Sequence, residues 1–150
     1  ENFTDNYLEI VKKRIYQGSK EEKASACYAL YLGLLNLLRM FAPFTPFITE
    51  EVYQNHFKKY EGKKSIHLEE WPSRMGIREL KHDEKVWNKL IEIIGKVRQA
   101  KSEAKKPMNA KIVLDIAPSD AKILHDVSDD LKAVSGATVL RAGKFMVDFV

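Results

Sequence analysis

The side chains of this sequence that could do chemistry are mainly cationic, and they are densest near residue 100. The segment KVRQAKSEAKKPMNAK, residues 96–111, has six lysine and arginine side chains against one acid, Glu103. Arg98, Lys101 and Lys105 recur at i, i+3 and i+7, so a helix would place them on one face. Such a row can follow the phosphates of a nucleic acid, because each neutralised phosphate releases a counterion. The alternative is a solvated helix face with cations near its negative end.

A second basic cluster, Lys12-Lys13-Arg14, lies near the start of the chain. Aromatic side chains that could stack on unpaired bases also exist, although their helical spacing is more typical of a core. These aromatic residues are Tyr7, Tyr16, Tyr53 and Tyr60.

Catalytic and metal-binding constellations are not recognisable in the sequence. The histidines are His56, His67, His82 and His125. None has metal-ligand spacing to another histidine or to Cys27. There is no glycine-rich phosphate loop, nucleophile elbow or dinucleotide fingerprint. We therefore predict no catalytic residue, no metal and no cofactor in this chain.

Composition indicates a folded protein with a mild preference for anionic partners. The 150 residues are 45% hydrophobic and carry a net charge of +4. The single cysteine, Cys27, excludes an internal disulfide and fits a reducing compartment, so we expect a cytoplasmic location. The longest apolar stretch, residues 26–38, is too short to span a bilayer, so no membrane association is expected.

Helical spacing dominates the first half. An amphipathic opening helix is followed by Gly18 as a left-handed stop. Ser19 and Glu22 form a capping box at the start of an apolar helix over about residues 20–41. Because that helix is apolar nearly all round, we expect it in the middle of a bundle.

Two prolines predict a tight corner after this helix. Pro43 ends it, Thr45 can cap the next helix, and Pro46 fits its first position. The next helix runs to about residue 59 and turns Ile48, Val52 and Phe57 inward.

After Gly62 the sequence is typical of an extended connector, and an α+β unit follows it. The expected elements are a helix over about 83–105, a strand over 111–117, a helix over 118–131 and two closing strands with a hairpin turn at Ala142-Gly143. The predicted fold is mainly α, with a partial helical bundle and its connector over 1–75. A long helix and a small α+β unit of about three strands follow over 76–150.

Three segments resemble the anticodon-binding region of the class I aminoacyl-tRNA synthetases that charge valine, isoleucine and leucine. They are NYLEIVKKRIY (6–16), LLRMFAPFTPFITEEVYQ (37–54) and SIHLEEWP (65–72). The segment VRQAKSEAKKPMNAKI (97–112) resembles the valine-charging members in particular.

The resemblance implies a helical bundle that holds the tRNA anticodon stem and loop, followed by a small α+β appendage. The complete enzymes charge tRNA with the use of ATP, but their His-x-Gly-His-like and Lys-Met-Ser-Lys-Ser-like motifs are not in this sequence. We therefore expect a non-catalytic part of a valine–tRNA ligase. Its partners would be tRNA(Val) and the enzyme's catalytic and editing domains, with ATP used by the catalytic domain.

Family bundles also have helices before NYLE. Their absence predicts an exposed apolar face on the first two helices, which could mediate dimerisation.

Charge and placement suggest the tRNA contacts. Lys12, Lys13 and Arg14 would approach the anticodon arm, and Arg98, Lys101 and Lys105 would approach its backbone. Two alternatives remain: the anticodon-binding domain of an isoleucine-charging enzyme, or a helical protein-interaction module whose basic residues serve solubility. Steep weakening of binding by salt would favour the RNA binders.

Overall fold

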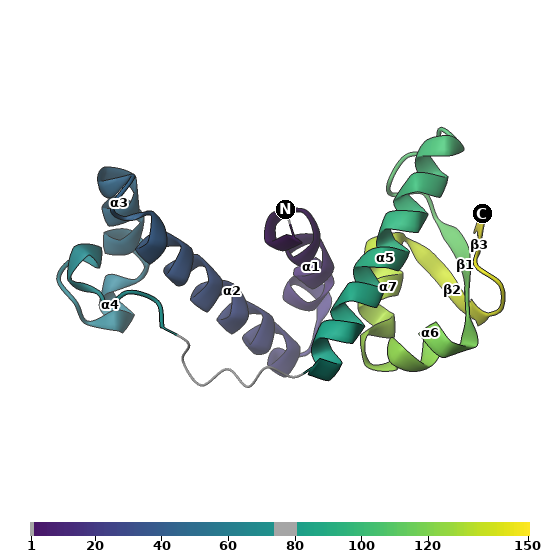
Figure 1. Cartoon of the computed structure of the whole chain (residues 1–150), viewed down its shortest axis with the longest axis horizontal. Helices are drawn as coiled ribbons and strands as arrows, with labels where there is room; N and C mark the ends of the chain where they lie inside the picture. The colour runs from purple at the N-terminus through teal and green to yellow at the C-terminus, as the bar shows by residue number, and fades with distance from the viewer. Residues whose placement is uncertain (1, 74–80) are drawn as a thin grey trace. The chain divides into compact units, whose positions relative to one another are not determined.

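The computed structural model describes residues 2–73 and 81–150, which form two compact units (Figure 1). The helical unit is Ser19–Arg78, and the α+β unit combines Glu1–Gly18 with Glu79–Val150. The predicted boundary between residues 75 and 76 lies outside the described residues. The division differs from the predicted one at the N-terminus, because the first eighteen residues pack with the second half of the chain. The predicted class, mainly α with a small α+β unit, is confirmed.

The helical unit contains three α-helices and a short 3₁₀ turn in its described residues. Their bounds are α2 (Lys20–Phe41), α3 (Pro46–His56), α4 (Lys58–Glu61) and η2 (Ile66–Leu68). Its core is formed by Leu35, Leu38, Ala42, Tyr53, Phe57 and Ile66.

Local signals at the helix ends are partly confirmed. Ser19 Oγ accepts the Glu22 N–H, and the Glu22 carboxylate accepts the Ser19 N–H, so the capping box is present. Pro46 is the first residue of α3. Thr45 does not cap α3, because its hydroxyl donates backwards to the Phe41 carbonyl. Gly18 has φ of −69°, so it is not the left-handed stop that we predicted.

The central position predicted for α2 is not what the described residues show. Only Ala26, Leu35 and Leu38 of this helix are buried, and Tyr28 and Phe41 are exposed. On α3, Ile48 is 60% exposed rather than turned inward. Among the described helices, α2 is also the one whose length and apolar composition would allow it to cross a bilayer. We had predicted no membrane span because we considered only the shorter apolar run at residues 26–38.

The α+β unit surrounds a small mixed sheet. Its elements are η1 (Asn2–Tyr7, a π-helix), α1 (Leu8–Gln17), α5 (Lys81–Glu103), β1 (Ile112–Ile116), α6 (Pro118–Ile123), η3 (His125–Val127), α7 (Ser128–Ser135), β2 (Ala137–Ala142) and β3 (Met146–Phe149). The single helix predicted over 118–131 is thus divided between α6 and α7, with a 3₁₀ turn between them.

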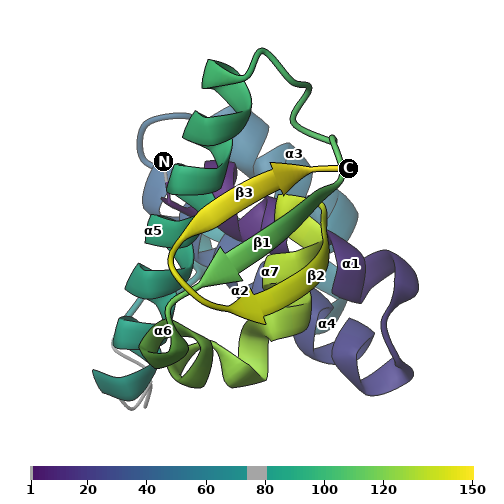
Figure 2. The ribbon, with the colours of Figure 1, turned by 90° about the vertical axis from the view of Figure 1, so that its right-hand side faces the viewer.

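The closing strands do not form the hairpin that we predicted. The strand order is β2-β1-β3, with β1 parallel to β2 and antiparallel to β3 (Figure 2). The segment from α6 to α7 returns the chain so that β2 enters beside β1 in the same direction. Residues 143–145 then pass the end of β1, where the Gly143 N–H donates to the Ile116 carbonyl at 2.8 Å.

The core of the α+β unit joins residues from distant parts of the chain. Leu90, Ile93, Ile94 and Val97 of α5 pack with the buried face of β1 and with Leu131 of α7. Ile10 of α1 belongs to the same cluster. This burial explains why the first helix lies in the α+β unit, since it completes the core beside α7.

Candidate nucleic-acid interface

Residues of helices α1, α5 and α7 line an open hollow of about 830 Å³ in the α+β unit. Five of its lining side chains are cationic and one, Glu9, is acidic; we call it the basic hollow. Its cations are Lys12, Lys13, Arg98, Lys101 and Lys132. Four of the six residues predicted to contact tRNA are thus brought together from segments that are about 90 positions apart.

The α1 side of the basic hollow has lysines and larger polar groups on one helix face. Lys12 and Lys13 are followed one turn later by Tyr16 and Gln17, and all four line the hollow. Lys12 forms an exposed ion pair with Glu9 at 2.6 Å, which contributes little stability and can be exchanged for a ligand.

Arg98 of α5 and Lys132 of α7 are the cations that the other two helices contribute to the surface of the hollow. The Arg98 guanidinium is half-buried and donates to Asn6 Oδ1 at 2.9 Å and to the Asp5 carbonyl at 3.2 Å. These acceptors are neutral, so they orient the guanidinium without cancelling its charge. Lys132 on α7 lies 3.5 Å from Asp129. We did not predict Lys132 as a site residue, because Asp129 and Asp130 precede it in the sequence and it belongs to no basic cluster.

Lys101 lines the basic hollow, but its ammonium is bonded to carbonyls of the protein itself. Its side chain is fully buried, and its ammonium donates to the carbonyls of Met108, Ala110 and Ser135 at 2.7–2.8 Å. Burial lowers the pKa of this lysine. A side chain at Gly136, where φ is +71°, would meet the Ala110 carbonyl at 2.8 Å.

Arg14 and Lys105 lie outside the residues that line the hollow. Arg14 binds the buried carboxylate of Asp130 through Nε, at 2.9 and 3.1 Å, and through Nη2. This bidentate pair joins α1 to α7. Helix α5 ends at Glu103, and Lys105 is exposed in the turn that follows. Lys105 therefore does not lie on the same helix face as Arg98.

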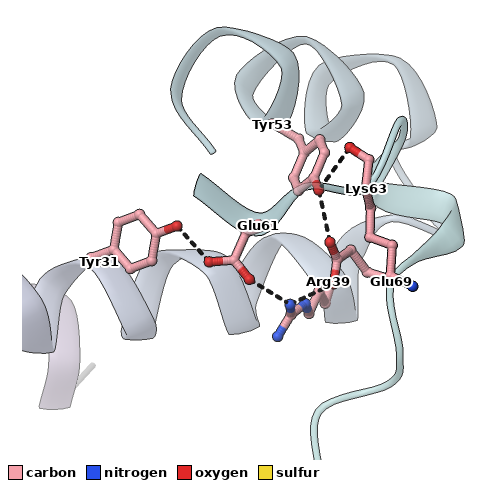
Figure 3. A network of polar contacts seen from close by, with 6 residues as sticks. All are labelled: Tyr31, Arg39, Tyr53, Glu61, Lys63 and Glu69. Carbon is pink, nitrogen blue, oxygen red and sulfur yellow. Dashed lines mark hydrogen bonds and ion pairs between the residues drawn. The ribbon is translucent and has the colours of Figure 1, made fainter. Parts of the chain in front are cut away.

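The helical unit has a different arrangement of charge (Figure 3). Arg39 of α2 binds Glu69 at 2.6 Å and Glu61 at 3.3 Å. The hydroxyls of Tyr31 and Tyr53 donate to Glu61 and Glu69 at 2.5 and 2.7 Å, respectively. We call these five residues the Arg39 network. Partial burial and the bonded Glu61 carboxylate raise the pKa of Tyr31 to about 12. The network ties α2 to α4 and to the connector.

No group of three or more histidine, cysteine, aspartate or glutamate side chains is placed to hold a metal ion in the described residues. Cys27 is exposed on α2.

Comparison with known families assigns the chain to a class. The family model described as the anticodon-binding domain of tRNA ligase matches residues 1–117, and the chain belongs to this family. The resemblance found from the sequence motifs is therefore confirmed.

Individual relatives are valine–tRNA ligases. The chain is 42% identical to the enzyme of Thermococcus kodakarensis over 108 residues, which are 72% of this chain and 12% of that protein. It is 38% identical to the Thermobifida fusca enzyme over 142 residues, 93% of this chain and 16% of that protein. It is also 38% identical to the Archaeoglobus fulgidus enzyme over 138 residues, 91% and 15%, respectively. The chain thus spans only a small part of the length of these relatives.

Proposed function

We propose that this chain is the tRNA-binding part of a valine–tRNA ligase and that its basic hollow contacts the anticodon arm of tRNA(Val). The observation that carries the proposal is the convergence of Lys12, Lys13, Arg98 and Lys132 on one hollow in a member of the anticodon-binding family. Cations gathered on one concave surface attract a polyanion and weaken its binding with rising salt. The valine relatives support the choice of tRNA.

Each cation has a definite role in this proposal. Lys12, Lys13 and Lys132 contact phosphates. Arg98 presents an oriented guanidinium, and exposed Lys105 extends the surface beyond the hollow. Lys101 and Arg14 act from within: Lys101 holds the floor, and Arg14 fixes α1 against α7.

The test is a binding titration of the 150-residue chain with tRNA(Val) and tRNA(Ile) transcripts at several salt concentrations. We expect tighter binding of tRNA(Val) and a steep fall in affinity with salt. Equal binding of the two tRNAs would remove the valine assignment. Binding that does not respond to salt would contradict the role of the basic hollow.

The exposed apolar surface of the helical unit favours a second role. Phe44, Phe47 and Ile48 are 79%, 90% and 60% exposed, near Phe41 at 53%. Apolar patches of this kind commonly mark interaction sites. We propose that this surface contacts another part of the longer enzyme or a second copy of the chain. Sedimentation of the isolated chain tests the second arrangement, since a monomer at all concentrations would exclude it.

The remaining assignments follow from the same proposal. ATP would be used by the catalytic domain of the longer enzyme and not by this chain. The location would be cytoplasmic, where the thiol of Cys27 stays reduced.

A further inference from the structure

Tyr16 is the only aromatic side chain among the described residues that line the basic hollow. Its side chain is 74% exposed. Its helix does bury Ile10 and Val11. The ring therefore stands beside Lys12 and Lys13 with its surface accessible to a ligand.

The other candidate tyrosines are occupied by contacts within the protein. Tyr7 lies 6.2 Å from Trp87 between ring centres, and Tyr53 is fully buried. Tyr60 lies against Tyr31, and the Lys59 ammonium sits 4.6 Å from its ring centre. Tyr60 is itself 67% exposed, but its ring is engaged by these two neighbours, and it does not line the basic hollow.

Polar groups around Tyr16 match the parts of a nucleotide. Lys12 and Lys13 precede the ring by one helical turn, where they can bind flanking phosphates. Gln17 and Asn109 are exposed amides that line the same hollow and can pair with base edges. The volume of about 830 Å³ lies within the range of small-ligand sites, roughly 300–1,000 Å³.

We propose that the basic hollow takes an unpaired RNA nucleotide, with its base stacked on the ring of Tyr16 and its phosphates on Lys12 and Lys13. A paired stem keeps its bases stacked on one another, so it offers phosphates but no free base face. Stacking would therefore distinguish a loop from a stem, whereas the lysines bind both. This inference rests on the proposed tRNA-binding function and specifies which part of the RNA enters the hollow.

The test compares two RNAs, an anticodon stem–loop and a fully paired duplex with the same number of phosphates. The protein variants are Tyr16→Ala and Tyr16→Phe, with Tyr28→Ala as a matched control because Tyr28 is also exposed, at 64%, but lies in the helical unit. Circular dichroism and the urea midpoint establish that each variant is folded.

We expect Tyr16→Ala to weaken stem–loop binding about tenfold, since stacking of one base contributes on that order, and to leave duplex binding and the salt slope unchanged. Tyr16→Phe keeps the ring and should keep the affinity. The fluorescence of 2-aminopurine in the loop should be quenched by the wild-type chain and Tyr16→Phe but not by Tyr16→Ala.

Four outcomes would overturn the inference. Unchanged stem–loop binding by Tyr16→Ala, or equal weakening for both RNAs, would show that no base stacks on the ring and would leave the proposed function intact. An equal loss with Tyr28→Ala would remove the assignment to the hollow. Failure of the wild-type chain to bind tRNA or either RNA would overturn the proposed function and this inference together.

Discussion

Arg98 in the α+β unit and Arg39 in the helical unit are held in opposite ways. In the α+β unit, cations surround an open hollow, and Arg98 is held by neutral acceptors that leave its charge available. In the helical unit, Arg39 is enclosed by two carboxylates that are themselves bonded by tyrosines. The difference teaches that a partly buried arginine between two carboxylates holds elements together, whereas an arginine on neutral acceptors keeps a charge that an anionic ligand could use.

The largest expected effect is the loss of the Arg39 network. Arg39→Met leaves Glu61 and Glu69 facing each other without their shared cation, and Glu69 is only 7% exposed. Removing one partner of a largely buried pair should lower the free energy of unfolding of the helical unit by about 3 kcal/mol.

Urea unfolding can be followed in each unit separately, because Trp71 lies in the helical unit and Trp87 in the α+β unit. Arg39→Met should shift the midpoint reported by Trp71 in a Trp87→Phe background. Lys58→Met is the control, since Lys58 forms an exposed bond to Gln54. Equal midpoints for the two variants would contradict a special role for Arg39.

The next effect tests whether Lys101 is structural. Lys101→Met leaves three buried or partly buried carbonyls without their donor, so the α+β unit should lose about 2 kcal/mol of unfolding free energy. Lys105→Met, at an exposed position, should change it by less than about 0.5 kcal/mol. Urea unfolding followed by Trp87 measures both. Unchanged stability combined with a smaller salt slope for RNA binding would instead place Lys101 at the ligand.

A smaller effect concerns pH and the helical unit. Burial alone would raise the pKa of Glu50, but bonds from Gln54, Ser65 and the Ile66 N–H outweigh it and lower the pKa below the ordinary 4.5. A lowered folded pKa stabilises the charged form at neutral pH, and this contribution disappears as pH falls from about 4.5 through the folded value.

Glu50→Gln should therefore cost about 0.5 kcal/mol at neutral pH, and this cost should shrink in acid. Thermal melts between neutral pH and about pH 3 cover the relevant range. Glu51→Gln provides the control, because its carboxylate is exposed and is bonded by Asn55. A Glu50→Gln deficit that stays constant with pH would disprove the linkage.

The smallest effect on stability, but a clear one on binding, is expected at the hollow. Lys12→Gln and Lys13→Gln should each leave folding unchanged and reduce the slope of log affinity against log salt by about 1. Lys122→Gln, an exposed change on α6, should leave the slope unchanged. If Lys122→Gln lowered the slope equally, the basic hollow would not be the particular surface that contacts RNA.

Features encoded within a few residues could be predicted from the sequence. The capping box of Ser19 and Glu22, the position of Pro46 and the balance of helix and strand all follow from local rules, and the family motifs were informative. Four of the six candidate tRNA contacts line one hollow, and their role in RNA binding stays a prediction.

Features that depend on distant partners could not be predicted. Lys101 has the same residue type and spacing as an exposed cation, and only the carbonyls of the folded chain bury it. The strand order depends on where β2 enters beside β1, which the hairpin rule ignores. Tyr16 was grouped with core tyrosines because periodicity does not tell which face of a helix finds a partner.

The bond between Arg14 and Asp130 joins positions that are 116 residues apart, and it sets an order of events during synthesis. The helical unit is continuous in sequence, so it can fold as soon as it leaves the ribosome, while α1 waits for α7. Helix α1, one wall of the basic hollow, is therefore synthesised first but takes its place only after α7 has been made. The hollow therefore takes its final form only after α7 has been synthesised.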